Sequence, residues 1–131
     1  MLWLSGLLGL GGMIRFLSYT PAPPPPKRFE IGPESSYLLG SRTVLPQIPA
    51  LLVRSQAGFT AISLVCTHLG CTVETNKGSR GINPPDSGFV CNCHGSRYDA
   101  DGQVTKGPAV QPLATLVVEH TADGNLIVIK G

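Results

Sequence analysis

Two short clusters of cysteine and histidine constrain this chain more than any other feature of its sequence. The first reads Cys-Thr-His-Leu-Gly-Cys over residues 66–71, and the second reads Cys-Asn-Cys-His-Gly-Ser over residues 91–96. Together they hold all 4 cysteines and all but one of the 3 histidines. Thiolates and imidazoles in this combination suit either a tetrahedral zinc ion or an iron–sulfur centre. A metal bound by both clusters requires a fold that brings them together.

The two clusters offer more ligands than one zinc ion uses, because structural zinc takes four. An economical assignment uses the first cysteine and the histidine of each cluster as metal ligands: Cys66, His68, Cys91 and His94. It leaves Cys71 and Cys93 to form a disulfide between the clusters. From the residues alone, zinc and iron–sulfur both remain open.

Composition limits the kind of domain that can carry these clusters. The chain has 131 residues, 42% of them hydrophobic and 14% charged, and a net charge of +2. These values predict one domain with a modest core, and they exclude both an intrinsically disordered chain and a nucleic-acid-binding protein. The 16 glycines and 12 prolines argue against a helical bundle and favour short strands joined by turns.

From residue 29 onward the sequence predicts an all-β domain. Residues 51–53 and 59–65 flank a turn at 55–58, and residues 116–119 and 126–129 flank a second turn at 122–125. The stretch 76–87, rich in glycine, proline and asparagine, is predicted to be a loop. His120 belongs to no motif, and we expect it to face solvent from a strand.

The first 19 residues differ from the rest, because Arg15 is their only charged side chain. A membrane-spanning helix needs about 20 apolar residues, so we predict a membrane anchor over residues 1–19, with Trp3, Phe16 and Tyr19 at the two interfaces. A cleaved signal peptide and a buried soluble helix are the alternatives. Residues 20–28 contain five prolines between positions 21 and 26 and are predicted to form a polyproline II tether. An SH3 or WW ligand is the competing interpretation.

The two clusters resemble the two boxes of a Rieske [2Fe–2S] protein, specifically of the disulfide-containing branch found in cytochrome bc and bf complexes. The resemblance is strong over about residues 66–113. It implies that Cys66, His68, Cys91 and His94 bind one [2Fe–2S] cluster and that Cys71 and Cys93 form a disulfide. Ring-hydroxylase ferredoxins and oxygenases share the ligands but lack the two additional cysteines.

The resemblance also assigns roles around the cluster. It implies that Ser96 and Tyr98 donate hydrogen bonds to cluster or ligand sulfur and raise the reduction potential. Gly107 and Pro108 then belong to a loop that covers the cluster, and Leu69 packs beside a quinone pocket. The sequence departs from the family at two positions: Val110 and Asn92 stand where proline is usual. These departures leave the ligands intact but change the loops around them.

The fold implied by the resemblance is a Rieske domain of three antiparallel sheets with the cluster loops at its tip. The implied organisation is an anchor over 1–19, a tether over 20–28 and a Rieske domain over 29–131, whose cluster-binding part spans about 66–112.

The implied function is that of a Rieske subunit of a quinol-oxidising cytochrome bc-type oxidoreductase, with cytochrome b and a c-type cytochrome as partners. His68 and His94 expose ring nitrogens at the tip, and quinol binds a cluster histidine, for which we predict His94. A c-type cytochrome or a copper protein accepts the electron. The alternatives are the small subunit of an arsenite-oxidase-type enzyme and an exported soluble carrier.

Two observations conflict over the location of this domain. Arg15, Lys27 and Arg28 all follow the apolar run, which by charge counting favours a cytoplasmic domain. A disulfide between Cys71 and Cys93 instead indicates an oxidising compartment. We give the disulfide more weight and predict that the domain lies on the extracytoplasmic side of a membrane.

Overall fold

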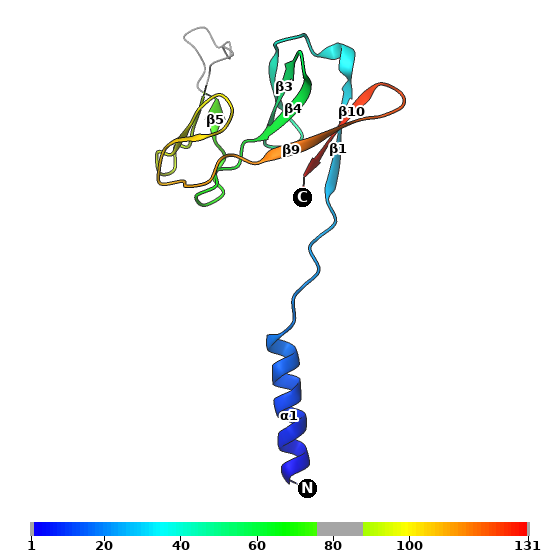
Figure 1. The fold of residues 1–131 in the computed structure, drawn as a ribbon, viewed down its shortest axis with the longest axis vertical. Coiled ribbons are helices and arrows are strands. Elements are labelled where there is room, and N and C mark those ends of the chain that lie inside the picture. Colours follow the sequence, from blue (N-terminus) through cyan, green and yellow to red (C-terminus); the bar gives the residue numbers. More distant parts are fainter. Residues whose placement is uncertain (1, 76–87, 131) are drawn as a thin grey trace.

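A computed structural model describes residues 2–75 and 88–130 of the chain (Figure 1). Its elements are α1 (Leu2–Leu17), β1 (Lys27–Pro33), the 3-10 helix η1 (Glu34–Ser36), β2 (Arg42–Leu45), β3 (Ala50–Ser55), β4 (Gly58–Ser63), β5 (Glu74–Thr75), β6 (Phe89–Val90), β7 (Arg97–Tyr98), β8 (Val104–Lys106), β9 (Thr115–His120) and β10 (Asn125–Lys130). The loop predicted over 76–87 lies outside the described residues.

The described strands form two antiparallel sheets. The larger has the order β1-β10-β9-β4-β3-β2, and the smaller has the order β5-β6-β7-β8. Both predicted hairpins are confirmed: β3 pairs with β4 around Gln56 and Ala57, and β9 pairs with β10 around residues 121–124. The all-β fold predicted from the sequence is therefore present in the described part of the chain.

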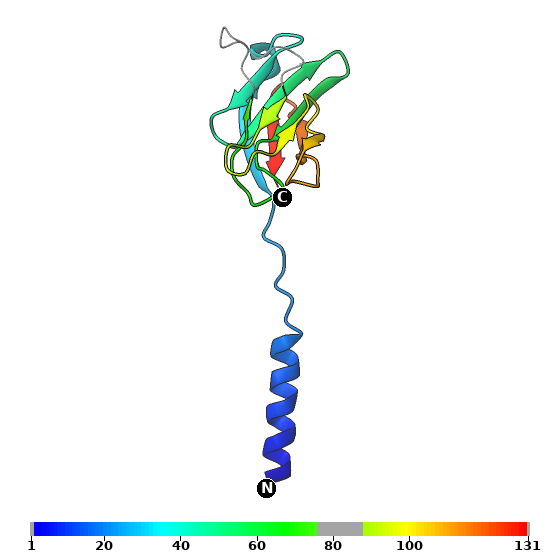
Figure 2. The ribbon, with the colours of Figure 1, turned by 90° about the vertical axis from the view of Figure 1, so that its left-hand side faces the viewer.

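The resemblance predicts three antiparallel sheets, and the described strands form three such groups, β1-β10-β9, β2-β3-β4 and β5-β6-β7-β8, of which the first two join. Two three-stranded halves, β1-β10-β9 and β2-β3-β4, join into one sheet because Ala61 pairs with Leu116 and Ile62 pairs with Thr115. Strand β9 makes this possible because its later residues pair with β10 while its first two pair with β4. Figure 2 shows the resulting curled sheets above the helix.

Two hydrophobic clusters lie in the described part of the head, which we define as residues 27–130. One is formed mainly by side chains of the larger sheet and includes the fully buried residues Ala50, Leu126 and Val128. The other joins Leu51 and Ile62 of that sheet to Phe89 and Tyr98 of the smaller sheet, and it also includes both free cysteines. The second cluster therefore ties the cysteine loops to the rest of the domain.

Helix α1 forms where the sequence predicts a membrane-spanning helix, but it does not meet that prediction. It contains 16 residues, fewer than the roughly 20 that a span requires. Within residues 2–75 and 88–130, we find no helix with the length and apolar character needed to cross a membrane. Residues 20–26 form an extended, exposed segment between α1 and β1.

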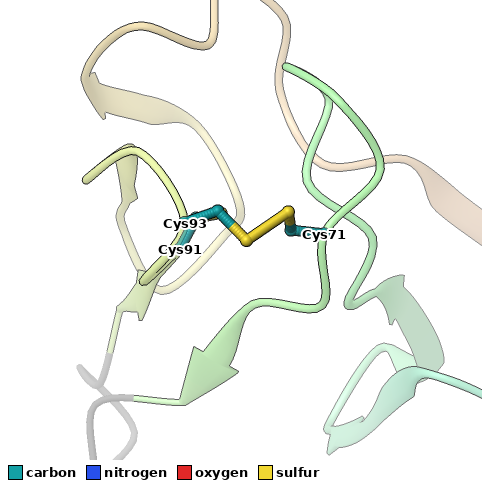
Figure 3. A group of neighbouring side chains, drawn as sticks. All are labelled: Cys71, Cys91 and Cys93. Atoms are coloured by element: carbon teal, nitrogen blue, oxygen red, sulfur yellow. A yellow bond between two sulfur atoms is a disulfide. The ribbon is translucent and has the colours of Figure 1, made fainter.

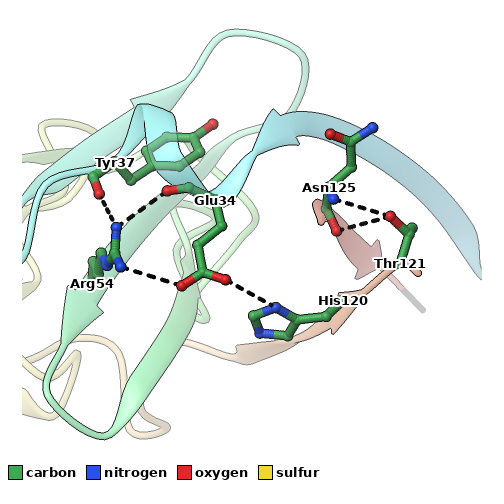
Figure 4. Close-up of polar contacts among 6 residues, drawn as sticks. All are labelled: Glu34, Tyr37, Arg54, His120, Thr121 and Asn125. Atoms are coloured by element: carbon green, nitrogen blue, oxygen red, sulfur yellow. Dashed lines mark hydrogen bonds and ion pairs between the residues drawn. The ribbon is translucent and has the colours of Figure 1, made fainter. Parts of the chain in front are cut away.

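His120 is half-exposed on β9, as expected, but it also belongs to a polar network (Figure 4). Its Nδ1 lies 3.6 Å from Oε2 of Glu34, and its ring packs edge-on against Phe59. Arg54 donates to Oε1 and the backbone carbonyl of Glu34 and to the backbone carbonyl of Tyr37. The network links η1 to β3 and β9, and we assign it a structural role.

Candidate metal centre

The two cysteine clusters form loops with the same backbone hydrogen bonds. In the first loop, residues 66–71, the Cys66 N–H donates to the Cys71 carbonyl at 2.7 Å and the Gly70 N–H donates to the Cys66 carbonyl at 2.9 Å. In the second loop, residues 91–96, the corresponding bonds run from Cys91 to Ser96 and from Gly95 to Cys91, both at 2.9 Å.

A glycine at the fifth position makes this turn possible. Gly70 and Gly95 have φ values of 80° and 79°, a region that side-chain-bearing residues rarely adopt. Each loop thus presents the side chains between its first cysteine and its glycine away from the core.

The first cysteine of each loop is buried, and the two thiols contact each other. Cys66 and Cys91 are free and retain 2% and 1% of their exposure. Burial raises the pKa of the Cys66 thiol, but hydrogen bonds with Tyr98, the backbone at His68, and the side chains of Cys91 and Ser96 outweigh it and leave the pKa below its ordinary value. The chain thus stabilises a thiolate at Cys66.

The two predicted imidazole ligands also lie together. The ring centroids of His68 and His94 are 4.9 Å apart, and the rings meet edge-on at 84°. His68 is partly buried and His94 is exposed. The loops therefore arrange one pair of thiols in the interior and one pair of imidazoles toward solvent.

The predicted disulfide between Cys71 and Cys93 is present and joins the two loops (Figure 3). The Cys91 sulfur lies within 4.8 Å of both disulfide sulfurs. The structure gathers the ligand atoms of these three cysteines in this way, but not those of the four predicted ligands.

Tyr98 and Ser96, predicted to tune the centre, both reach Cys66. The Tyr98 hydroxyl oxygen is 3.2 Å from the Cys66 sulfur. Burial, followed by the hydrogen bond with Cys66, raises the pKa of the Tyr98 phenol, so Tyr98 stays protonated and can donate. Ser96 is fully buried, and its Oγ accepts a hydrogen bond from the Ala109 N–H at 3.0 Å. Its own hydroxyl hydrogen is therefore available to a sulfur.

Sequence reasoning missed Thr67, which lies between the two ligands of the first loop. Its hydroxyl donates to the Gln111 carbonyl at 2.6 Å, and its N–H donates to the Tyr98 hydroxyl oxygen at 3.3 Å. Its Oγ1 is also 3.2 Å from that hydroxyl, so the Tyr98 hydrogen is shared between Thr67 and Cys66. The position of Thr67 in the sequence could have indicated this role, because a hydroxyl residue between two metal ligands can anchor the loop that carries them.

The segment over residues 107–112, predicted to cover the cluster, touches both loops. Ala109 bonds Ser96 of the second loop, and Gln111 bonds Thr67 of the first. The segment begins with a cis peptide bond between Gly107 and Pro108. We call it the covering segment. It holds the two loops from the same side through one hydrogen bond each.

Two apolar side chains remain exposed near this centre. Leu69, predicted to dock quinol, is 70% exposed at the end of the first loop. Val110 of the covering segment is 85% exposed. Exposed aliphatic residues beside the histidines suit contact with an apolar ligand or a partner surface.

Comparison with known proteins identifies the domain that carries these loops. The family model described as "Rieske [2Fe-2S] domain" matches residues 30–117. The cytochrome b6-f complex iron-sulfur subunit 2 of Nostoc sp. is 45% identical over 75 residues, which cover 56% of this chain and 38% of the relative. A cytochrome b6-f complex iron-sulfur subunit of Prochlorococcus marinus is 31% identical over 102 residues, covering 73% and 52% respectively.

Two further proteins are similar to this chain. The Bos taurus mitochondrial Rieske subunit of the cytochrome b-c1 complex is 47% identical over 64 residues, covering 49% of this chain and 21% of the relative. The crystal structure of the plasma membrane Rieske protein PetC3 from Synechocystis PCC 6803 matches with a TM-score of 0.47 and 29% identity, covering 76% of this chain and 97% of that one. The chain spans about half or less of the length of the curated relatives named here.

Proposed function

This chain belongs to the Rieske [2Fe-2S] domain family, and from that premise we propose that it holds one [2Fe–2S] cluster through Cys66, His68, Cys91 and His94. In Rieske centres two histidines replace two cysteines on one of the two irons. The residues present fit that pattern, because the thiols form one pair and the imidazoles another. The pairing of these four side chains across two matching loops is the observation that carries the proposal.

When bound, such a cluster supplies one-electron redox chemistry at a potential between about −150 and +300 mV. The chain's own residues set where in that range the potential lies. Hydrogen bonds from Tyr98 and Ser96 to Cys66 withdraw charge from the thiolate and so favour the reduced state. Burial of Cys66 and Cys91 excludes water from the thiolate end.

We propose further that the chain is the Rieske electron-transfer subunit of a quinol-oxidising cytochrome bc-type complex. Relatives named as subunits of cytochrome b6-f and b-c1 complexes support this function. Cytochrome b would supply the quinol-binding surroundings, and a c-type cytochrome or a copper protein would accept the electron. The oxidoreductase activity belongs to the complex, and the chain alone carries electrons.

The exposed end of the centre would receive the quinol. His94 presents its ring to solvent, so the ring nitrogen that does not bind metal would be open to a hydrogen bond with quinol, and it would accept that bond and take up the proton once it carries no hydrogen of its own. The Leu69 side chain offers an apolar surface beside it. His68 is less exposed, and we assign it mainly to ligation.

For the placement of the head, we propose attachment to a membrane through residues 1–19, with the head on the extracytoplasmic side. The described side chains of α1 are exposed and largely apolar, including Leu7, Leu10 and Phe16. The Cys71–Cys93 disulfide supports an oxidising compartment. Residues 20–28 would act as the tether that lets the head move between electron donor and acceptor.

Spectroscopy of the purified chain tests the cluster directly. With its disulfide intact and iron and sulfide supplied, the chain should contain two irons and give a Rieske-type EPR signal on reduction. The Asn92→Ala variant, altered at an exposed position between two cysteines, serves as a control and should keep the signal. Stoichiometric zinc with no iron in anaerobically prepared protein would contradict the cluster.

Fractionation tests the assignment to a complex. Washed membranes should retain the chain, and a b-type haem should co-purify with it. A chain that carries the cluster but is released by washing, with no haem protein attached, would support the soluble-carrier alternative instead. This second experiment is independent of the first, because the cluster can be present in either case.

A further inference from the structure

The sulfurs of Cys71, Cys91 and Cys93 form a compact group that the proposed cluster does not use as a unit. All three lie within 4.8 Å of one another (Figure 3). In a tetrahedral zinc site, thiolates bound at about 2.3 Å stand about 3.8 Å apart. The group is therefore small enough for a single tetrahedral ion, once its sulfurs are free to bind one.

We propose that opening the Cys71–Cys93 disulfide creates a three-thiolate site for zinc or a similar soft cation, and that the disulfide thereby excludes this metal. Cys91 would belong to both sites, so zinc and the cluster would exclude each other. The consequence for cluster loading rests on the proposed function, but the zinc site itself does not.

The chemistry of the switch is a reduction followed by metal binding. Two reductant thiols, or one phosphine together with one water molecule, supply two electrons and two protons, so that the Cys71–Cys93 sulfur–sulfur bond breaks and two cysteine thiols form. The reductant becomes a disulfide or a phosphine oxide. The three thiols then lose their protons as the metal binds, because the thiolate is the ligand form.

Before reduction, the same group makes a poor site. Two of its three sulfurs are bonded to each other and carry no charge, so only Cys91 can supply a thiolate. After reduction, Cys93 is exposed and Cys71 is partly exposed, so a cation can reach them from solvent. Cys91 is held in place by its backbone bond to Ser96, which keeps the third sulfur beside the other two.

Cobalt titration of the iron-free full chain in detergent tests the site. Co²⁺ replaces zinc and gives thiolate charge-transfer absorption, and its displacement by Zn²⁺ gives the zinc affinity. One batch keeps the disulfide, and the other is reduced with a phosphine that is then removed. The reduced chain should bind one Co²⁺ at least about 100-fold more tightly than the oxidised chain, since it gains two thiolate ligands. Equal affinities would overturn the proposal.

Two cysteines of the first loop provide matched variants, both measured in the reduced state. Cys71→Ser removes a sulfur of the compact group and should weaken Co²⁺ binding by at least about tenfold. Cys66→Ser removes a thiol outside that group, next to Cys91, and should weaken Co²⁺ binding clearly less than Cys71→Ser does. Equal losses in the two variants, or the reverse order, would overturn the proposal. So would binding of equal strength by the reduced chain in urea, because the site depends on the fold.

Competition connects the site to the cluster. With iron, sulfide and zinc supplied together, the oxidised chain should form the cluster and the reduced chain should take zinc. If the oxidised chain forms a cluster from iron and sulfide but the reduced chain binds no Co²⁺, the zinc site fails and the proposed function stands. If the reduced chain binds Co²⁺ but the oxidised chain never forms a cluster, the proposed function fails and the zinc site stands.

Discussion

The first loop (residues 66–71) and the second loop (residues 91–96) share their backbone hydrogen bonds but use their side-chain positions differently. The third position is His68 in one loop and Cys93 in the other, while the sixth is Cys71 in one and Ser96 in the other. Histidine occupies the third position of the first loop and the fourth of the second. The same turn therefore carries two different arrangements of ligand and disulfide.

The loops also differ in what holds them to the head. In the second loop, Ser96 is fully buried and bonds Ala109, so the contact lies in the interior. In the first loop, Thr67 is exposed; it bonds the Gln111 carbonyl and the hydroxyl of the buried Tyr98. We therefore expect the second loop to be the more rigid of the two and the first to depend more on the disulfide.

The ligand cysteines should behave alike despite these differences, and their loss should have the largest effect. Cys66→Ser and Cys91→Ser each remove a thiolate from the buried pair, and we expect both variants to lose the cluster completely. Iron content and the EPR signal measure this. A variant of either cysteine that keeps two irons and the Rieske signal would refute the ligand assignment.

Removing the disulfide should lower the stability of the chain and should affect the first loop more than the second. The bond joins residues 22 apart, and in the loop-entropy model it contributes about 3 kcal/mol to the free energy of unfolding. The double variant Cys71→Ala/Cys93→Ala should lose about this amount in urea denaturation of the iron-free chain. Amide exchange should rise more in the first loop than in the second, because the second keeps its buried Ser96 bond. Equal increases in both loops would contradict the difference in rigidity.

Much of the fold follows from local patterns that a sequence displays directly. Both hairpins were predicted, since short apolar runs on either side of a tight turn indicate the pairing locally. The joining of the two halves into one sheet was not predicted, because the pairing of Ala61 with Leu116 links residues far apart in the chain. No local pattern encodes such a pairing.

In the site, too, features carried by local motifs were predicted, and features that depend on distant contacts were not. The Cys71–Cys93 disulfide was predicted from the two motifs and is present, and Tyr98 lies against the Cys66 sulfur as expected. The role of Thr67 was not predicted, because it depends on the covering segment reaching back over more than 40 residues to place Gln111 beside it. The compact group of three sulfurs was also invisible in the sequence, since it depends on how the disulfide sits against Cys91.

Two variants that each remove a hydroxyl next to the Cys66 sulfur should have smaller effects than loss of a ligand or of the disulfide. Tyr98→Phe and Ser96→Ala each remove a hydrogen bond to the thiolate, worth about 1.5–3 kcal/mol, so each should lower the potential by tens of millivolts, to about 130 mV at most. Ser96→Ala also leaves the buried Ala109 N–H without its acceptor, which should cost a further 1–3 kcal/mol or so of stability.

Redox titration and urea denaturation of both variants separate the two effects. Tyr98→Phe should lower the potential with little loss of stability, because Thr67 keeps its bond to Gln111. Ser96→Ala should lower both. If Tyr98→Phe destabilises the chain as much as Ser96→Ala does, the first loop is anchored through Tyr98 rather than through Gln111.

The smallest expected effect on the potential tests the exposed end of the first loop. Leu69→Ala removes an apolar side chain that is 70% exposed and carries no hydrogen-bond donor for sulfur, so the potential should move by less than about 10 mV, well under a tenfold change in equilibrium. Quinol turnover in membranes should nevertheless fall, because an apolar docking surface has been lost. Val110→Ala, which truncates the exposed aliphatic residue of the covering segment, is the control for loss of apolar surface. A larger fall in turnover for Leu69→Ala than for Val110→Ala would assign docking to the first loop. A shift in potential for Leu69→Ala as large as that for Ser96→Ala would show instead that the side chain acts on the cluster, and the separation of docking from tuning in this loop would be wrong.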